Sequence, residues 1–369
     1  MPGFIPFNYS NKEVEFCMKQ MRNAARTAVL LFVAVTFVSL TATAQGSGKA
    51  VLKVMSYNVN EGTDFLEVLS ATNLDQFLKA VEVTLNNVDA TNPPLRMQAV
   101  AKEIAQTQPD LVGLQEVTSW SVGGQVRYDM LEELLGALHQ LGEDYVPVVV
   151  VDEFQLGGLL PDFVTSVQCL NHDVILARAA SQLELSNIRK DHFNVILQLP
   201  TAVGPVDITR GWGSVDVSLH GASFRFIVSH LENYIAAAPA TLLIQEAQAA
   251  ELALGPAGTS LPAIVAVDTN ADALGNDPTI ATYQLITSFG FGDAWGAVHP
   301  DLAGPTWGFM PDAADPRPII RQRIDCIFFN NGIRALTAQL AGQRVQEKVN
   351  GLWPSDHAGV RAGLQVGSD

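Results

Sequence analysis

The chain has 369 residues, of which 48% are hydrophobic, and its net charge is −16. Three cysteines are too few for a small disulfide scaffold. The acidic balance disfavours tight, sequence-indifferent binding to duplex DNA, because such binding depends on neutralising phosphates with Lys and Arg. It is compatible with nuclease activity, since divalent cations can offset the charge at one site.

Residues 1–44 have the composition of an export signal. An apolar run over residues 28–40 is too short to span a bilayer comfortably. Ala42-Thr43-Ala44 follows with the small-x-small pattern of a signal-peptidase site, which predicts a mature N-terminus at Gln45. Met21 is a second candidate for the start of the chain, and a signal anchor that is never cut is the alternative interpretation. Four cations precede the apolar run: Lys12, Lys19, Arg22 and Arg26.

Cleavage after residue 44 would leave 18 Lys and Arg against 36 Asp and Glu, a net charge of −18. We expect a secreted or periplasmic monomer without a transmembrane segment. Residues 45–50 are predicted to be a linker, and residues 51–369 a single domain. The remaining cysteines, Cys169 and Cys326, allow one disulfide in an oxidising compartment.

Apolar periodicity predicts the elements of the first half of the chain. The β-rich run at 51–57 is the first buried strand. It is followed by helical spacing at 64–87, a break at Asn92-Pro93-Pro94, a helix at 95–106, a strand at 110–115, a helix at 128–141 and a strand at 146–151.

The second half contains shorter strands and fewer helices. An irregular stretch at 152–168 precedes predicted strands at 173–177, 193–199, 213–219 and 223–228, the last two joined through His220-Gly221. A helix at 240–254, a strand at 263–267, a helix at 278–289, a Pro-rich loop at 304–318 and a strand at 324–329 follow. Many short strands with few helices predict an α/β fold, in which helices cover a sheet-on-sheet core.

Six polar clusters stand at the ends of apolar runs or between them. They are Ser56-Tyr57-Asn58, Leu114-Gln115-Glu116, Ser229-His230-Leu231-Glu232, Val267-Asp268-Thr269-Asn270, Arg323-Ile324-Asp325 and Ser355-Asp356-His357. Carboxylates, amides and histidines at strand ends are what a metal-assisted hydrolytic site requires. Taken singly, each has a plain structural explanation: His230 could be a satisfied core histidine, and Asp268 with Asn270 could form an Asx turn.

In this order the six clusters resemble those of the endonuclease/exonuclease/phosphatase superfamily, over nearly the whole chain after residue 50. The resemblance implies a four-layer sandwich of two packed mixed β-sheets flanked by helices. Residues 64–94 would be a helical insertion at an edge where substrate could bind.

The same resemblance implies a metal site made of oxygen ligands. Glu116 would be the principal ligand, Asn58 would contribute its amide oxygen, and Asp356 would share or neighbour the site. Hard oxygen ligands suit Mg²⁺, with Mn²⁺ or Ca²⁺ as possible substitutes.

The remaining residues would act on water and on the phosphoryl group. Asp268 and Asn270 would hold and deprotonate the attacking water, and Asp325 would orient His357. His357 would stabilise charge on a phosphoryl oxygen, with His230 as a further donor. Arg210 and Asn233 are candidates for substrate binding.

The predicted function is an exported, metal-dependent hydrolase of phosphodiester bonds that acts by direct attack of water. Its substrate could be a small molecule, an oligonucleotide or a lipid headgroup. One alternative is a deoxyribonuclease-like enzyme acting on single strands or oligonucleotides. A sphingomyelinase or phospholipase C-like enzyme and a non-catalytic binding module on the same fold are the others.

Overall fold

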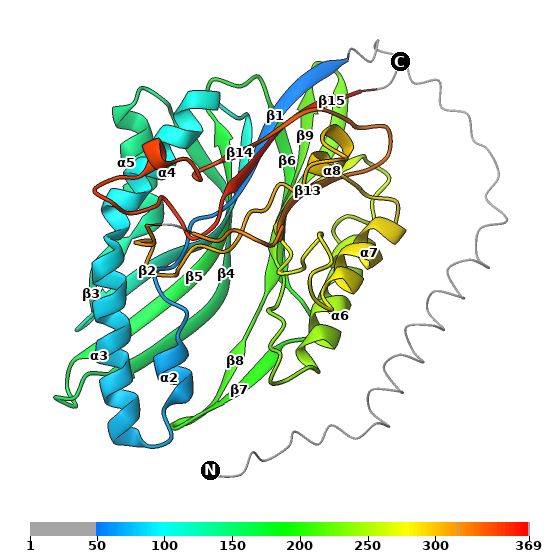
Figure 1. Cartoon of the computed structure of the whole chain (residues 1–369). Coiled ribbons are helices and arrows are strands. Elements are labelled where there is room, and N and C mark those ends of the chain that lie inside the picture. The colour runs from blue at the N-terminus through cyan, green and yellow to red at the C-terminus, as the bar shows by residue number, and fades with distance from the viewer. Residues whose placement is uncertain (1–48, 317, 368–369) are drawn as a thin grey trace. The chain divides into compact units, whose positions relative to one another are not determined.

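Two mixed β-sheets packed face to face form the centre of the protein, as the computed structural model shows (Figure 1). The structure describes residues 49–316 and 318–367. The predicted export segment and its cleavage site lie outside these residues. The first strand begins at Ala50, inside the predicted linker. Among the described residues, no helix is long and apolar enough to cross a membrane.

The first sheet has seven strands in the order β14-β15-β1-β2-β5-β4, with β3 paired to β2. Within it β1 and β2 run parallel, and the other neighbours are antiparallel. The strands are β1 (Ala50–Asn58), β2 (Leu111–Val122), β3 (Gln125–Asp129), β4 (Tyr145–Leu159), β5 (Ser166–Arg178), β14 (Arg334–Ala341) and β15 (Gly359–Val366).

The second sheet has six strands in the order β12-β13-β11-β10-β9-β6, and it too contains one parallel pair, β10 with β11. Its strands are β6 (Glu184–His192), β9 (Gly211–Leu219), β10 (Ala222–His230), β11 (Ala263–Asp268), β12 (Gly292–Asp293) and β13 (Asp325–Phe329). A separate two-stranded sheet consists of β7 (Leu197–Thr201) and β8 (Gly204–Ile208).

The inner faces of both sheets supply the main core. Leu52, Val54 and Ile175 from the first sheet pack with Phe226 and Ile264 from the second, all fully or almost fully buried. The sheets approach closely at Gly113, where a Cβ would come within 2.6 Å of the Ala266 Cβ. Only glycine fits this contact without a shift of the backbone.

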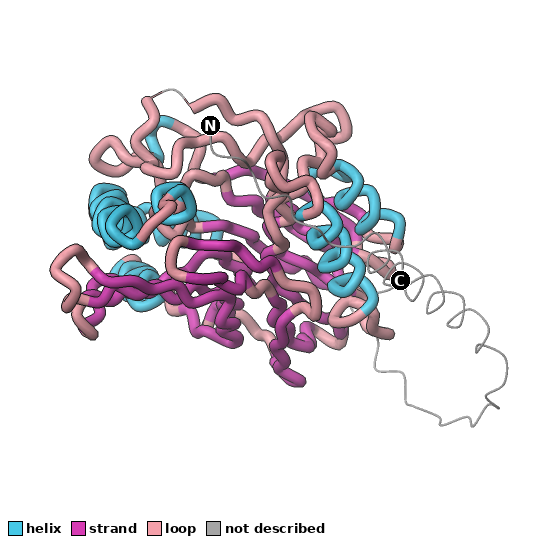
Figure 2. The backbone as a smooth tube through the Cα atoms, turned by 90° about the horizontal axis from the view of Figure 1, so that it is seen from below, coloured by secondary structure: helices cyan, strands magenta, loops and turns pink. Residues whose placement is uncertain are grey.

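Helices cover the outer face of each sheet, which completes four layers (Figure 2). The first sheet is covered by α4 (Pro93–Thr107) and α5 (Met130–Gln140), the second by α6 (Thr241–Leu254) and α7 (Ile280–Ser288). Asn92 caps α4 by accepting a hydrogen bond from the Leu95 N–H, and the two prolines occupy the first turn, where no N–H is required. A short helix, α8 (Ala294–Val298), and a 3₁₀ turn, η1 (Val345–Glu347), are also present. The predicted α/β sandwich is confirmed.

The predicted insertion at 64–94 contains two helices, α2 (Leu66–Ser70) and α3 (Leu74–Thr91). Phe77 and Val81 of α3 pack against Phe154 of β4 and Leu197 of β7. The insertion, the outer ends of β4 and β5, and the β7–β8 hairpin therefore form an additional apolar cluster beside the two sheets.

Several predicted boundaries are wrong. The stretch at 152–168 is not irregular, because β4 continues to Leu159 and β5 begins at Ser166. The predicted strand at 193–199 spans the gap between β6 and β7. The sequence does not indicate β6, because it is an edge strand with almost every residue exposed and so lacks an apolar pattern. The possible disulfide is not formed: Cys169 on β5 and Cys326 on β13 are buried free cysteines in different sheets.

Candidate active site

The two parallel strand pairs deliver polar residues to the same end of the sandwich. In the first sheet Asn58 at the end of β1 lies opposite Gln115, next to Glu116. In the second sheet His230 at the end of β10 lies opposite Asp268 at the end of β11. Parallel strands necessarily place their carboxyl ends side by side, which brings clusters far apart in the sequence together.

The strands on either side supply the other members. Asp325 is the first residue of β13 and pairs with Asp268. His357 precedes β15, which pairs with β1. Ser355 fixes this connection, because its hydroxyl donates to the Asn58 carbonyl (2.7 Å) and accepts from the His357 N–H (3.1 Å).

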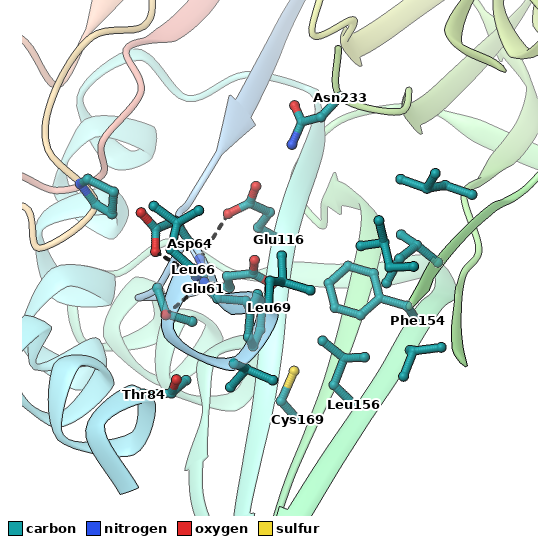
Figure 3. A pocket seen from close by; sticks show the side chains of 18 of the residues that line it. Glu61, Asp64, Leu66, Leu69, Thr84, Glu116, Phe154, Leu156, Cys169 and Asn233 are labelled. Atoms are coloured by element: carbon teal, nitrogen blue, oxygen red, sulfur yellow. Dashed lines mark hydrogen bonds between the residues drawn. The ribbon is translucent and has the colours of Figure 1, made fainter. Parts of the chain in front are cut away.

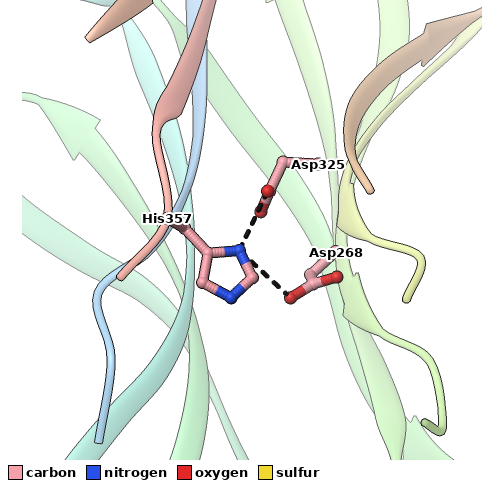
Figure 4. Close-up of side chains that lie close together, drawn as sticks. All are labelled: Asp268, Asp325 and His357. Carbon is pink, nitrogen blue, oxygen red and sulfur yellow. Dashed lines mark hydrogen bonds and ion pairs between the residues drawn. The ribbon is translucent and has the colours of Figure 1, made fainter. Parts of the chain in front are cut away.

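Asp268, Asp325 and His357 form a buried cluster (Figure 4). The His357 Nδ1 lies 2.9 Å from Asp325 Oδ2 and 3.8 Å from Asp268 Oδ2. One ligand atom from each of the three residues lies within 4.8 Å of the others, so the group could hold a metal ion.

This cluster perturbs the protonation of its members. Burial raises the pKa of Asp268 to about 7, and neighbouring Asp325 adds to the shift. Burial alone would lower the pKa of His357, but the carboxylates of Asp325, Asp356 and Asp268 outweigh it and raise that pKa well above its ordinary value. His357 is therefore charged, and Asp268 can accept or hold a proton near neutral pH.

Asn58 links the two sheets through its amide. The Nδ2 donates to Glu116 Oε1 and to Asp268 Oδ2, both at 2.9 Å, while Oδ1 accepts from the Asn60 N–H. The amide nitrogen thus faces the carboxylates, and the oxygen that was predicted to bind metal is used by the backbone. The ligand role of Asn58 remains a prediction, and as placed it positions the two carboxylates.

Glu116 does not end its strand, contrary to the expectation. It lies at a β-bulge between Leu114 and Val117 with φ of 60°, and β2 continues to Val122. A bulge re-aims one side chain without ending the strand. Here the Glu116 Oε2 accepts from the Glu61 N–H (3.0 Å), and the side chain lines a cavity.

The two carboxylates predicted as metal ligands, Glu116 and Asp356, lie near each other. Burial raises the pKa of Asp356 to about 7, His357 opposes the shift, and Glu116 adds to it. A divalent cation would relieve this repulsion between oxygen donors, so the donor set fits the predicted hard metal.

Glu61, which follows the first strand and was not among the predicted site residues, also belongs to the site. Its side chain accepts a hydrogen bond from the Asn171 amide (2.7 Å) and is buried. Burial, with Glu116 next, raises the pKa of Glu61 well above its ordinary value. A second carboxyl group thus lies beside the predicted metal ligand.

His230 is held neutral. The Arg210 Nη1 donates to its Nδ1 (3.0 Å), and burial, Arg210 and His357 together lower its pKa well below the ordinary value. The other ring nitrogen, Nε2, lies 3.5 Å from Asp268 Oδ2 and 2.9 Å from the amide Nδ2 of Asn270, so both ring nitrogens of His230 are in contact with polar groups of the protein.

The Asx turn foreseen at Asp268 is present, because its Oδ1 accepts from the Asn270 N–H at 2.9 Å. The turn holds Asn270 with φ of 48°. Asp268 and Asn270 therefore form a local Asx turn and also contribute their side chains to the site.

The two predicted substrate-binding residues line the same cavity (Figure 3). Arg210 is buried and lies 3.9 Å from Glu232, so its charge is already balanced. Asn233 lies on the same side of the cavity as Glu116 in Figure 3, away from Leu156 and Cys169. The cavity has a volume of about 720 Å³ and also exposes Asp268, Asn270, Glu116, Asp356 and His357.

Comparison with known proteins agrees with this geometry. The model of the Endonuclease/Exonuclease/phosphatase family matches residues 55–357. A protein of that family from Leptotrichia buccalis has a similar structure, with 15% identity, a TM-score of 0.55 and coverage of 85% of this chain and 99% of its own. No curated protein sequence matches the chain.

Two further similar structures belong to proteins with a named activity or a bound ligand. A mannosyl-6-phosphatase from Bacteroides thetaiotaomicron is 18% identical with a TM-score of 0.51, covering 85% of this chain and 99% of that one. TDP2 from D. rerio, complexed with a single-strand DNA product, is 16% identical with a TM-score of 0.51, over 85% and 99%. At these identities the likeness concerns the fold.

Proposed function

The chain belongs to the endonuclease/exonuclease/phosphatase family of hydrolases, and we propose that it is an exported, metal-dependent phosphodiesterase. The observation that carries this proposal is the meeting of Asp268, Asp325 and His357 beside Glu116 and Asp356 at one end of a cavity. Strands of both sheets supply these groups, and the Asp268, Asp325 and His357 side chains are buried, unlike an ordinary cluster of acidic residues on the surface.

Glu116 and Asp356 would hold the metal, with the Asp268 cluster as neighbouring donors. When bound, Mg²⁺, or Mn²⁺ or Ca²⁺ in its place, would supply positive charge to the phosphoryl oxygens. The alternative of a non-catalytic binding module is disfavoured because every predicted catalytic side chain lines the cavity or directly contacts one that does.

Asp268 is suited to activate water. A carboxylate with a pKa of about 7 can take a proton from an attacking water at neutral pH. Asn58 and the Asn270 N–H fix its two oxygens. Charged His357 would donate to an oxygen on which negative charge develops, and His230 remains the candidate for a further donor.

A single-strand nuclease is the second candidate, favoured by the family and by the fold it shares with TDP2. Export is proposed from the composition of residues 1–44 alone. Protein recovered outside the cytoplasm should begin at or near Gln45, and recovery of residues 21–44 in a membrane fraction would contradict export with cleavage.

The metal dependence can be tested with bis(p-nitrophenyl) phosphate. Protein treated with EDTA should lose turnover and regain it with Mg²⁺ or Mn²⁺. Asp268→Ala should lower turnover at saturating metal while binding of substrate stays nearly the same, because the activation of water by Asp268 acts largely in the transition state. Full turnover by the chelated enzyme would overturn the proposal.

A further inference from the structure

The cavity has two chemically different ends. At one end lie Glu116, Asp356 and His357, which the proposed reaction uses. Leu69, Phe154 and Leu156 also line the cavity (Figure 3), and Phe65, Phe77 and Ile208, which line it too, belong with Phe154 to one apolar cluster. We call these six residues the apolar compartment. The two ends are continuous, so one ligand can occupy both.

The apolar compartment is built from the outer part of strand β4 and from two elements outside the central sandwich. Phe65 and Leu69 come from the start of the 64–94 insertion, Phe77 from α3 of the same insertion, Phe154 and Leu156 from β4, and Ile208 from the β7–β8 hairpin. The insertion, the hairpin and the end of one sheet strand therefore meet around one space. Their apolar side chains surround an open space, whereas the apolar side chains of a protein core fill the space between them almost completely.

Apolar side chains also remain exposed in this space. Leu66 is 59% exposed, Leu69 is 40% exposed and Val203 is 52% exposed, and all three line the cavity. Clustered exposed apolar residues in a concave surface mark a binding site for an apolar group.

The charges around the cavity disfavour a polyanion. Arg210 is the only Lys or Arg among the described residues that line it, and it is occupied by His230 and Glu232. A second phosphate beyond the reacting one would meet carboxylates such as Glu61 or the apolar compartment. This lining disfavours a further negative charge in the part of a substrate that extends from the reacting phosphate.

We propose that the substrate is an amphipathic phosphodiester with an alkyl or acyl chain, and that this chain lies in the apolar compartment. The inference rests on the proposed phosphodiesterase function. The cavity volume of about 720 Å³ is in the range of pockets that enclose ligands of drug-like size, roughly 300–1,000 Å³. This size suits a single chain.

A series of p-nitrophenyl alkyl phosphates tests the chain directly. Methyl, butyl, octyl and dodecyl esters would be compared below the concentrations at which they form micelles. Burial of each methylene should raise kcat/KM by up to roughly fourfold until the cavity is full. A flat series would overturn the proposal, as would a p-nitrophenyl ester of thymidine 5′-phosphate that is hydrolysed faster than the octyl ester.

A pair of matched variants locates the chain. Leu69→Glu places a charge in the apolar compartment at a position already 40% exposed, and Leu254→Glu adds the same charge at a residue 65% exposed at the end of α6, outside the cavity. The ratio of octyl to methyl activity should fall at least about tenfold in Leu69→Glu and stay unchanged in Leu254→Glu. Equal ratios in both variants would place the chain elsewhere and overturn the proposal.

Binding separates this proposal from the function on which it rests. Octyl phosphate and methyl phosphate would be titrated into the wild-type protein by calorimetry, and octyl phosphate should bind at least about tenfold more tightly. If no ester is hydrolysed but this preference holds, the phosphodiesterase function fails and the apolar compartment stands. If every ester is hydrolysed without any preference for the alkyl chain, the phosphodiesterase function stands and the role of the apolar compartment is contradicted.

Discussion

The two ends of the cavity differ in which kind of side chain is unfavourably placed: polar groups are buried at one end, and apolar groups are exposed to solvent at the other. Beside the polar end, near Glu116 and Asp268, lies the buried carboxyl group of Asp173, whose two oxygens accept no hydrogen bond from the described residues. The apolar end exposes leucines such as Leu66 and Leu69. Burial of unpaired polar groups and exposure of clustered apolar groups both lower the stability of the folded chain. Both ends therefore have the marks of a surface shaped for a ligand.

Different interactions fix the side chains at the two ends of the cavity. At the polar end, positions are fixed by hydrogen bonds across the two sheets, as in the contacts of Asn58 with Glu116 and Asp268. At the apolar end, the walls are held by packing of Phe77, Val81 and Phe154 around the open volume. Changes at the polar end should chiefly affect turnover, and changes at the apolar end should affect stability and chain-length preference.

The largest effect is expected from His357 and Asp325. Substitution His357→Ala removes a charged donor aimed at developing negative charge, which typically costs roughly 100- to 1000-fold in turnover. Asp325→Asn should imitate it, because Asp325 binds the His357 Nδ1 and favours its charged form. The two single variants and the double variant would be compared by kcat.

In the double variant the loss should barely exceed that of His357→Ala, since residues that act as a unit are strongly non-additive. Circular dichroism would first establish that all three proteins are folded. Fully additive losses would mean that Asp325 does not act through His357.

A smaller effect is expected in the pH dependence of stability at Asp173. Burial, with Glu153 next, raises its pKa well above the ordinary value, so the folded state keeps a proton that the unfolded state releases above about pH 4. Stability from this group is present below that pH and is lost as pH rises toward the folded pKa. Asp173→Asn cannot titrate, so its stability relative to wild type should rise by about 1.4 kcal/mol per pH unit from pH 5 upward.

Urea unfolding at pH 5, 6 and 7 would measure this difference. Asp301→Asn, at an exposed residue away from the cavity, is the matched control and should show no such slope. Parallel pH profiles for wild type and Asp173→Asn would show that the buried carboxyl group is ionised in the folded protein.

The smallest expected effect is the difference in unfolding free energy between two Phe→Ala variants. Phe226 is fully buried between the sheets, and Phe226→Ala should cost about 3–5 kcal/mol. Phe77 faces the cavity, so Phe77→Ala removes fewer contacts and should cost about 1–2 kcal/mol less. Shifts in urea midpoints at unchanged slope would measure both values. Equal losses would indicate that the apolar compartment is packed like the main core.

The polar end was largely predictable from the sequence, because strand ends are local features. Each apolar run that leads to Asn58, His230 or Asp268 is a strand in the structure, and polar residues at its end have few other places to lie. The bulge at Glu116 was not predictable, since an inserted residue leaves the apolar pattern of β2 almost unchanged. The direction of the Asn58 amide likewise depends on Asn60 and on residues from another sheet.

The sequence by itself determined the two-sheet class, the helical nature of the insertion and the order of the polar clusters, because these follow from local periodicity and strand ends. Only the tertiary structure decided that Phe77 and Phe154 face an open space and that the space joins the catalytic end. The apolar pattern of α3 is the same whether its face covers a core or lines a cavity. The difference lies in what the outer ends of β4, β5, β7 and β8 place opposite it, and such long-range packing leaves no local trace in the sequence.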